Sequence, residues 1–287
     1  MKRTVKQLAM SGIRWAVGIT ARTPSGRYIL EQAANTLGER IRAIQHGQTH
    51  LKFVAANSLN DFRIATFSSK EPETLEWIDA IPPGSVIWDI GANIGLYSCY
   101  AAKARRCRVF AFEPSVFNLE LLARNVFLND LTDRVTIVPL ALSDRCAVNK
   151  LNMSTMERGG ALSTFGERYG HDGRPLHKAF EFATIGITMS DAVSSLGIPE
   201  PQYIKIDVDG IEHLILQGGM PVLQQVTGVL VEINDEFIEQ SRGSAQCLEA
   251  AGLRLRDKSH SRMVEESEFH LAYNQIWRRT TGAEQEV

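Results

Sequence analysis

The chain has 287 residues, of which 44% are hydrophobic and 22% charged, as in an ordinary globular protein. Its net charge of -2 gives no overall basic field, so the composition argues against a nucleic-acid partner. The four cysteines form no C-x-x-C pair, which disfavours a zinc site and a disulfide framework and predicts a reducing, cytoplasmic location.

The first residues predict an amphipathic helix over 8–19. Lys2, Arg3 and Lys6 precede this apolar run as they would in a signal peptide, but Arg14 interrupts it and no convincing cleavage site follows. No segment approaches the ~18 apolar residues of a membrane span. We expect the helix to cap the domain or to form a homodimer contact. Binding to a membrane surface is the less favoured alternative, because the polar face is only lightly basic.

Residues 1–80 are expected to form a helical and mixed extension. Apolar spacing predicts a helix over 27–44, and alternation predicts short strands within 51–67, with a turn at 57–61. A further helical pattern begins near residue 75 and stops at Pro82-Pro83-Gly84. The main domain would then occupy residues 81–287.

From residue 85 onward, apolar strands alternate with helices. The expected strands are 86–90, 108–112, 135–142, 203–208 and 229–233, and the expected helices are 94–105, 115–129, 211–217 and 235–251. An antiparallel pair at 253–257 and 275–278 would complete the sheet. This rhythm predicts an α/β, Rossmann-like fold with a seven-stranded, mostly parallel sheet and helices on both faces.

The stretch 86–95, VIWDIGANIG, reads as a buried strand, a glycine turn and the start of a helix. Gly91 and Gly95 bracket the turn, and Glu113 ends the next strand about twenty residues later. This is the βαβ arrangement of a nucleotide-type cofactor site, in which the carboxylate at the end of the second strand accepts the ribose hydroxyls.

The residues of the turn also indicate which class of cofactor it can bind. A dinucleotide site needs a glycine where Asn93 stands, because pyrophosphate passes there, and Asp89 adds a negative charge beside it. S-adenosylmethionine has no phosphate and carries ammonium and sulfonium cations. We therefore expect Asp89, Gly91, Asn93 and Gly95 to hold its methionine end. A nucleotide-binding oxidoreductase and a non-catalytic cofactor-binding module remain as alternatives.

Ionisable residues crowd the end of the strand at 203–208. Like-charge repulsion and burial there should raise at least one carboxyl pKa, which can provide a base for an alcohol. Asp207 is the first candidate for the base or a substrate ligand, and Glu232, at the next strand end, is the second. The candidate substrate residues are Asp209, Glu212 and His213, although His213 fits a plain position in a first helical turn at least as well. Lys205 should pair with a carboxylate.

The same edge offers hard oxygen ligands. Asp207, Glu232 and Asn234 stand at two adjacent strand ends and would suit magnesium. We do not favour a metal, because these groups serve equally well as a base and as hydrogen-bond acceptors.

Residues 152–186 are rich in Gly, Ser, Thr, His and Arg and separate two expected strands. So long an insertion in a compact domain is a functional lid or a disordered loop. Its place beside the cofactor edge favours a lid over the acceptor site.

The chain resembles the FkbM family of S-adenosylmethionine-dependent methyltransferases, over about residues 63–235. The matching motifs, in order, are KEPET (70–74), WDIGANIG (88–95), AFEP (111–114), NVFLN (125–129), ALSD (141–144), KIDVDGIE (205–212) and VEI (231–233). The resemblance implies a class I methyltransferase that methylates a hydroxyl group on a sugar, polyketide or related small metabolite. The acceptor would be a small molecule or glycan.

Class I methyltransferases suggest two further cofactor residues. Asp144 follows the third expected strand, where such enzymes recognise the adenine amine, but it fits a plain loop carboxylate equally well. Asn129 ends a helix and is either a cofactor residue or a simple C-cap.

Overall fold

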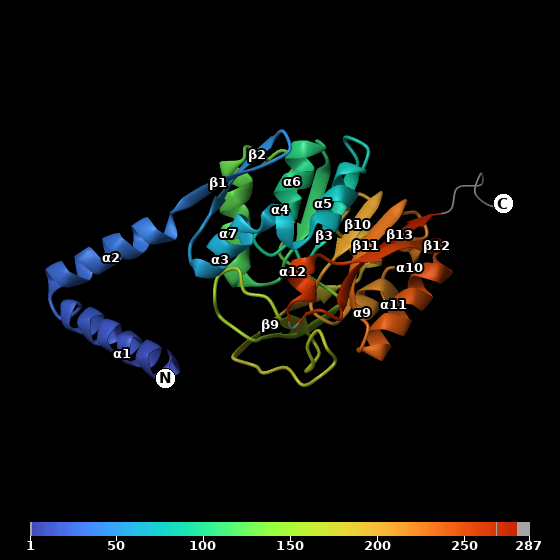
Figure 1. Cartoon of the computed structure of the whole chain (residues 1–287). Helices are drawn as coiled ribbons and strands as arrows, with labels where there is room; N and C mark the ends of the chain where they lie inside the picture. The colour runs from blue at the N-terminus through green and yellow to red at the C-terminus, as the bar shows by residue number, and fades with distance from the viewer. Residues whose placement is uncertain (1, 268, 280–287) are drawn as a thin grey trace.

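The computed structural model describes residues 2–267 and 269–279, with side chains from residue 10 onward. Within these residues, seven strands form one sheet in the order β12-β13-β11-β10-β3-β4-β5 (Figure 1). All run parallel except β13, which lies antiparallel between β11 and β12. The strands are β3 (Val86–Ile90), β4 (Arg108–Phe112), β5 (Val135–Val138), β10 (Tyr203–Ile206), β11 (Gly228–Asn234), β12 (Leu253–Ser259) and β13 (Ala272–Arg279). The expected seven-stranded, mostly parallel sheet is confirmed.

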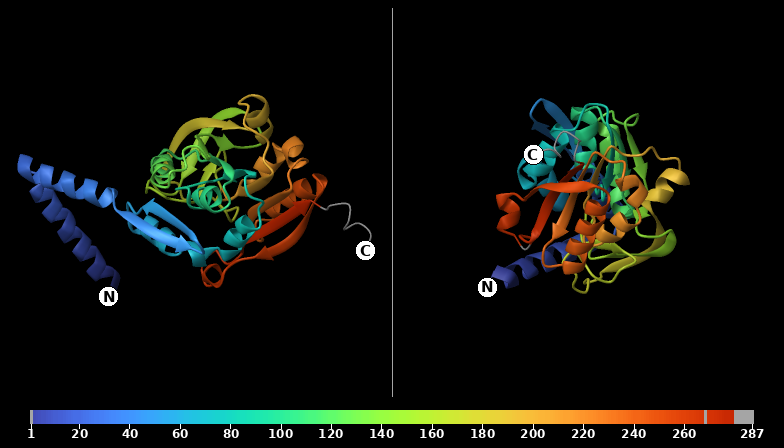
Figure 2. Two further views of the ribbon diagram at one scale, coloured as in Figure 1. Left: turned by 90° about the horizontal axis from the view of Figure 1, so that it is seen from above. Right: turned by 90° about the vertical axis from the view of Figure 1, so that its right-hand side faces the viewer.

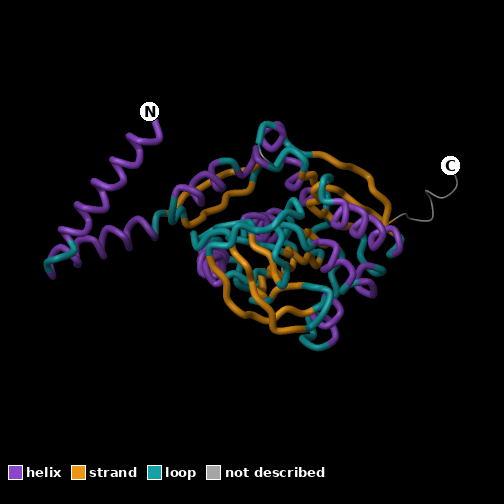
Figure 3. The backbone as a smooth tube through the Cα atoms, turned by 90° about the horizontal axis from the view of Figure 1, so that it is seen from below, coloured by secondary structure: helices purple, strands orange, loops and turns teal. Residues whose placement is uncertain are grey.

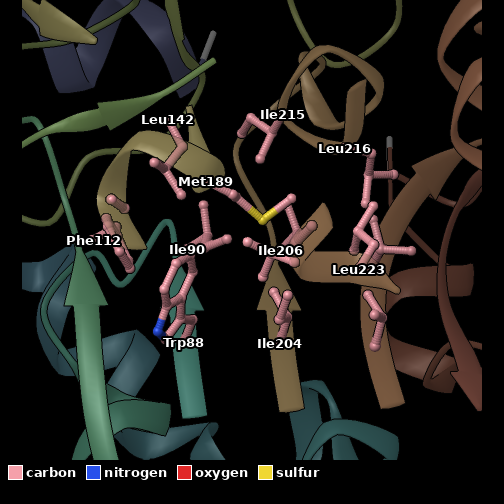
Figure 4. Close-up of a cluster of buried hydrophobic side chains, with 14 of the residues drawn as sticks. Trp88, Ile90, Phe112, Leu142, Met189, Ile204, Ile206, Ile215, Leu216 and Leu223 are labelled. Carbon is pink, nitrogen blue, oxygen red and sulfur yellow. The ribbon is translucent and has the colours of Figure 1, made fainter. Parts of the chain in front are cut away.

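Helices cover both faces of this sheet, because its apolar strands present side chains alternately to each face. Ile87 packs with the helices of one face, whereas Trp88 and Ile90 pack on the other (Figure 4). The first face carries α5 (Pro72–Asp79), α6 (Leu96–Ala104) and α7 (Val116–Leu128), and the second carries α8 (Met189–Ser194), α9 (Glu212–Gln217), α10 (Met220–Leu223) and α11 (Ile238–Ala250).

The first 40 residues form an arm that projects from the body (Figures 1 and 3). It consists of α1 (Lys2–Thr20) and α2 (Pro24–Gly38). The expected helix over 27–44 is too long. Gly38 ends α2, and Ile41 and Ile44 lie in β1 (Ile41–His46), which pairs with β2 (Thr49–Val54) through a turn with Gly47 at φ 54°. An i, i+3 pair cannot by itself distinguish a helix end from a strand start.

The strands expected over 51–67 are correct only for β2. The Asn57 side chain accepts a hydrogen bond from the Asn60 N–H and so caps α3 (Ser58–Ala65), which α4 (Phe67–Lys70) follows. Phe53 and Trp77 are buried in one cluster with Ile87 of the main sheet. Several side chains between residues 51 and 78 therefore pack in the core of the main sheet, whereas β1 is half exposed.

The strand expected at 135–142 is divided. Its second part, after Pro139, leaves the main sheet as β6 (Ala141–Leu142) and pairs with β9. In the described chain, β6, β7 (Ala147–Met153), β8 (Ser163–Phe165) and β9 (Phe180–Ile187) form a second sheet in the order β6-β9-β7-β8. The insertion expected as a loop over 152–186 is thus largely a small β-structure that begins at Ala147. Figure 2 shows it beside the main sheet.

Candidate functional site

The glycine turn after β3 brings two strand ends into close contact. Gly91 has φ 85°, and a Cβ atom there would lie 1.9 Å from the carbonyl oxygen of Asp207, at the end of β10. Gly95 starts α6 with φ 81°, and a Cβ there would lie 2.4 Å from Leu122. Asn93 between them is also left-handed, at φ 50°. Only glycines at these two positions let β3, β10 and α7 pack this closely.

Glu113, which directly follows β4, points its carboxylate back at this turn. Its two oxygens accept hydrogen bonds from the backbone N–H groups of Asn93 and Ser115, both at 2.8 Å. Burial raises the pKa of Glu113 to about 7, even though these N–H groups favour the charged form. The structure therefore places the predicted ribose residue directly against the predicted methionine-binding turn.

A pocket of about 70 Å³ lies between these elements. Its polar lining includes Asn93, Glu113, Asp207 and Asp209. The apolar lining belongs to the core cluster on the second face of the sheet and includes Ile90, Phe112, Leu142, Leu151, Phe165 and Ile215. Four of the residues predicted from the sequence to form the site, together with Gly91, thus meet in one cavity.

The insertion closes over this pocket through residues 159–163. The carbonyl oxygen of Gly160 accepts hydrogen bonds from the side-chain amides of Asn93 and Asn118, at 2.9 and 3.2 Å. Gly159 donates to Asn118, and Leu162 donates to Asp209 at 2.7 Å. The insertion thus contacts Asn93, a predicted cofactor residue, as well as Asp209, a predicted substrate residue. Its role as a lid over the acceptor site stays a prediction.

A charged cluster lies at the carboxyl ends of β10 and β11, toward α5 and α6. Lys205 is only 2% exposed, and its ammonium lies 3.0 Å from Asp207, which confirms the expected ion pair. Tyr97 donates to Glu71 at 2.9 Å, and Lys70 pairs with the other oxygen of Glu71.

The two candidate bases in this cluster have opposite pKa shifts. Burial alone would raise the pKa of Asp207, but Lys205, with Lys70, outweighs it and lowers that pKa below its ordinary value. Burial and the neighbouring carboxylates of Asp207 and Glu71 raise the pKa of Glu232 well above its ordinary range. Of these two candidate bases, only Glu232 has a raised pKa. Burial also raises the pKa of Asp209 and of Glu212, as predicted for the end of β10.

Four predicted cofactor residues do not line the pocket. Gly95 instead lies at the start of α6, close to Leu122. Asp89 points to the opposite face of the sheet, where it accepts a hydrogen bond from Ser98 at 2.5 Å. Asn129 bonds both the N–H and the carbonyl of Lys52 in β2, at 2.9 and 2.7 Å, and so fastens the hairpin to α7. Asp144 forms an ion pair with Arg145 at 3.2 Å.

Two predicted substrate residues are also buried away from the pocket. Glu212 accepts hydrogen bonds from the Gly210 N–H at 3.0 Å and from the Gln240 side chain. Burial raises the pKa of Glu212 to about 7. The His213 ring packs against Phe237, and burial lowers its pKa. Both side chains stabilise the α9–α11 contact.

The magnesium hypothesis finds little geometric support. Among the described residues, no group of three or more His, Cys, Asp or Glu side chains is arranged to hold a metal ion. The Asn234 side-chain oxygen accepts a hydrogen bond from the Glu236 N–H, and Lys205 already neutralises Asp207. That magnesium is not required stays a prediction.

Nothing in the sequence indicated that Glu71, Lys70, Tyr97 and Asn118 lie at or beside the site. The KEPET motif already singled out Lys70 and Glu71, but its position far upstream of the glycine turn gave no indication of contact with β10. Asn118 occupies an ordinary helical position, and no pattern in the sequence marks it.

A comparison with models of known families identifies the family of this chain. A sequence model described as the Methyltransferase FkbM domain matches residues 89–268. The chain belongs to this family.

Two curated relatives carry methyltransferase names. The FkbM-family chain is 30% identical over 153 residues to the hexuronic acid methyltransferase AglP of Haloferax volcanii, covering 52% of this chain and 56% of the relative. It is 26% identical over 178 residues to the 31-O-demethyl-FK506 methyltransferase FkbM of Streptomyces tacrolimicus, covering 53% and 66%. The matches thus span less than two thirds of these relatives.

Solved structures with a similar arrangement include precorrin-6y C5,15-methyltransferase from Geobacter metallireducens. The TM-score is 0.41 at 14% identity, with 73% of this chain and 87% of that chain covered.

Proposed function

We propose that this FkbM-family protein transfers a methyl group from S-adenosylmethionine to a hydroxyl group of a sugar, polyketide or related small molecule. The observation that carries the proposal is the single pocket in which the glycine turn and Glu113 meet Asp207, beside the buried charged cluster. The printed names of the relatives, a hexuronic acid methyltransferase and an O-demethyl-FK506 methyltransferase, support the same class of acceptor.

The residues present fit the cofactor at two points. The absence of a Cβ at Gly91 keeps the backbone of the turn open beside β10, and the Glu113 oxygens keep lone pairs that can accept the two ribose hydroxyls. Residues 159–163 are fastened over the pocket by hydrogen bonds to Asn93, Asn118 and Asp209, and we expect them to move outward when the cofactor enters.

When bound, S-adenosylmethionine would supply an electrophilic methyl group on a positively charged sulfur. The protein has to place the acceptor oxygen in line with that methyl carbon and exclude water, which is worth up to ~7–11 kcal/mol in favourable cases. As the new C–O bond forms, the hydroxyl proton must leave the acceptor oxygen. We assign that proton to the carboxylate of Glu232. This residue lies in β11, next to β10, in the charged cluster beside the pocket that Asp207 lines, and its raised pKa makes it a stronger base than Asp207, whose pKa is lowered.

In this assignment Asp207 is a positioning residue. Its ion pair with buried Lys205 fixes the end of β10, and its carboxylate can still accept a hydrogen bond from an acceptor hydroxyl. Glu71, held by Tyr97 and Lys70, adds the negative charge that keeps the Glu232 pKa high.

The test follows labelled methyl groups into products across a panel of glycosides and polyketides, read by mass spectrometry. Glu232→Gln should lower kcat by ~10²–10⁴-fold, because a general base contributes that much. It should leave cofactor affinity unchanged. The wild-type kcat should rise with pH until Glu232 is ionised, and the variant should lose that rise.

The exposed Glu76→Gln is the matched control and should behave as wild type. Normal turnover in Glu232→Gln would move the base to Asp207, with Asp207→Asn as the next variant. Tight cofactor binding without transfer to any acceptor would instead indicate a non-catalytic cofactor-binding module.

A further inference from the structure

The arm leaves large apolar side chains in solvent. Trp15 is 70% exposed, Ile13 64% and Leu37 65%, and every described residue of α1 from Met10 to Thr20 is exposed. The left view of Figure 2 shows that α1 and α2 stand clear of the sheet and its helices. A contiguous apolar surface of this kind on a folded protein marks an interaction site.

The α1 helix has a polar face and an apolar face. Ser11, Arg14 and Gly18 follow one another at spacings of three and four residues and so form one narrow polar face. The opposite side of the described part carries the apolar side chains Met10, Ile13, Ala16 and Val17, together with Thr20. Trp15 and Ile19 lie at the border of the polar face, since Trp15 follows Ser11 by four residues. An apolar face bordered by tryptophan, opposite a narrow basic face, is typical of a helix lying in a membrane interface.

The charge of the first 30 residues also favours a membrane surface as the partner. The first 30 residues contain six basic residues and no acidic one, while the chain as a whole has a net charge of -2. The acidic excess therefore lies entirely outside the arm. An anionic surface with an apolar interior would neutralise the basic residues and bury the apolar ones at the same time.

Two other roles fit the observations less well. A cap over the protein's own domain, one of the two roles expected from the sequence, fits less well because the described apolar side chains of α1, from Met10 onward, are exposed. Pairing of α1 with α1 of a second copy would bring like charges together. None of the described helices is long and apolar enough to cross a bilayer, so the arm would lie on its surface.

We propose that the α1–α2 arm binds the surface of a lipid bilayer that contains anionic headgroups, with Ile13 and Val17 inserted among the acyl chains and Trp15 at the level of the headgroups. This role is independent of the proposed methyl transfer, since the arm lies outside residues 89–268, which match the family.

The first experiment uses the full chain and vesicles of phosphatidylcholine with about 30% phosphatidylglycerol, an anionic lipid. Trp77, Trp88 and Trp277 are buried in the core, so a change in tryptophan emission on binding reports Trp15. We expect co-sedimentation and a blue shift with the mixed vesicles, both weakened by salt and nearly absent with pure phosphatidylcholine. Absence of binding to the anionic vesicles would overturn the proposal.

A matched pair of variants separates insertion from simple charge attraction. Ile13→Glu and Ser11→Glu add the same charge two residues apart, on the apolar and the polar face of one helix. Ile13→Glu should weaken vesicle binding on the order of tenfold or more, because it removes an aliphatic side chain that would be buried in the bilayer. Ser11→Glu should weaken it only about two- to threefold at moderate salt.

Equal losses in the two variants would contradict insertion. Light scattering provides the other decisive outcome. A concentration-dependent dimer that Ile13→Glu abolishes, with no vesicle binding by the wild type, would show that the arm contacts a second copy instead.

Discussion

Two buried glutamates, Glu113 and Glu212, have similar raised pKa values of about 7 but face different partners. Glu113 lies in the pocket and bonds two backbone N–H groups, so a ligand can reach it. Glu212 bonds Gly210 and Gln240 inside the protein. The same physical cause, burial of a carboxyl group, should therefore produce a ligand-linked titration at one residue and a stability-linked titration at the other.

For Glu113 the prediction concerns cofactor affinity. The ribose hydroxyls donate hydrogen bonds, so they prefer the charged carboxylate, and affinity for S-adenosylmethionine should rise as pH increases through about 7. Glu113→Gln should weaken binding by about 1–3 kcal/mol at pH 8 and remove this pH dependence. Calorimetry between pH 6 and 8 measures both, and unchanged affinity in the variant would refute the ribose assignment.

For Glu212 the prediction concerns stability. Its pKa is raised from 4.5 to about 7 in the folded protein, so the folded state holds the proton more tightly than the unfolded state. Protonated Glu212 therefore contributes up to about 3 kcal/mol to the free energy of unfolding. This contribution is complete below pH 4.5 and is lost as pH rises through about 7. Glu212→Gln should flatten this part of the pH dependence of the unfolding free energy, measured by urea denaturation. The exposed Glu249→Gln should not, and an unchanged slope in Glu212→Gln would contradict the assignment.

At the scale of elements, the insertion and the glycine turn form one unit. Gly159 and Gly160 bond Asn118 and Asn93, and Asp209 holds the backbone of Leu162. Opening this segment breaks a few hydrogen bonds of ordinary strength, each worth about 0.5–1.5 kcal/mol. The segment is thus fastened weakly enough to act as a gate for the cofactor.

The variant Gly159→Ala tests whether residues 159–163 control entry of the cofactor. Gly159 has φ 80°, and a Cβ there would lie 2.1 Å from Asn60 Oδ1, so alanine should destabilise the closed segment specifically. We expect the association rate of S-adenosylmethionine to increase on the order of tenfold in stopped-flow measurements, while kcat falls because the site is less well sealed. Gly197→Ala is the control, since Gly197 has φ 63° but open space around it. Slower association in Gly159→Ala than in the control would show that the segment does not gate entry.

At the scale of the whole molecule, residues 41–279 share one fold and the arm stands apart. Trp77 packs edge-on against Tyr203 of the central sheet, with ring centroids 6.1 Å apart, whereas Trp15 is exposed. Trp77→Ala should lower the unfolding free energy by about 3–5 kcal/mol, as expected for a core tryptophan. Trp15→Ala should change it by less than about 0.5 kcal/mol. Circular dichroism in urea measures both, and a small effect of Trp77→Ala would place residues 41–80 outside the cooperative core.

What the sequence could determine was local or periodic. Continuous apolar runs alternating with helices identified the strands of the main sheet, because burial on both faces requires that pattern. The glycine turn and Glu113 were found together because a βαβ unit fixes their spacing along the chain. The pairing of Lys205 was also predictable, because a buried ammonium needs a partner and Asp207 lies on the same face two residues later.

Only the tertiary structure decided which of these side chains meet. Asp89 and Gly91 are neighbours in sequence, yet Asp89 lies on the opposite face from the pocket, because strand residues alternate. Glu71 approaches the end of β10 only because α4 and α5 fold back onto the sheet, a contact that no local pattern encodes. The insertion likewise reaches Asn118 from some forty residues away. Local propensity fixes elements, whereas long-range packing fixes which groups share a site. That is why the glycine turn could be predicted from the sequence, whereas the choice between Asp207 and Glu232 as the proposed base depended on the structure.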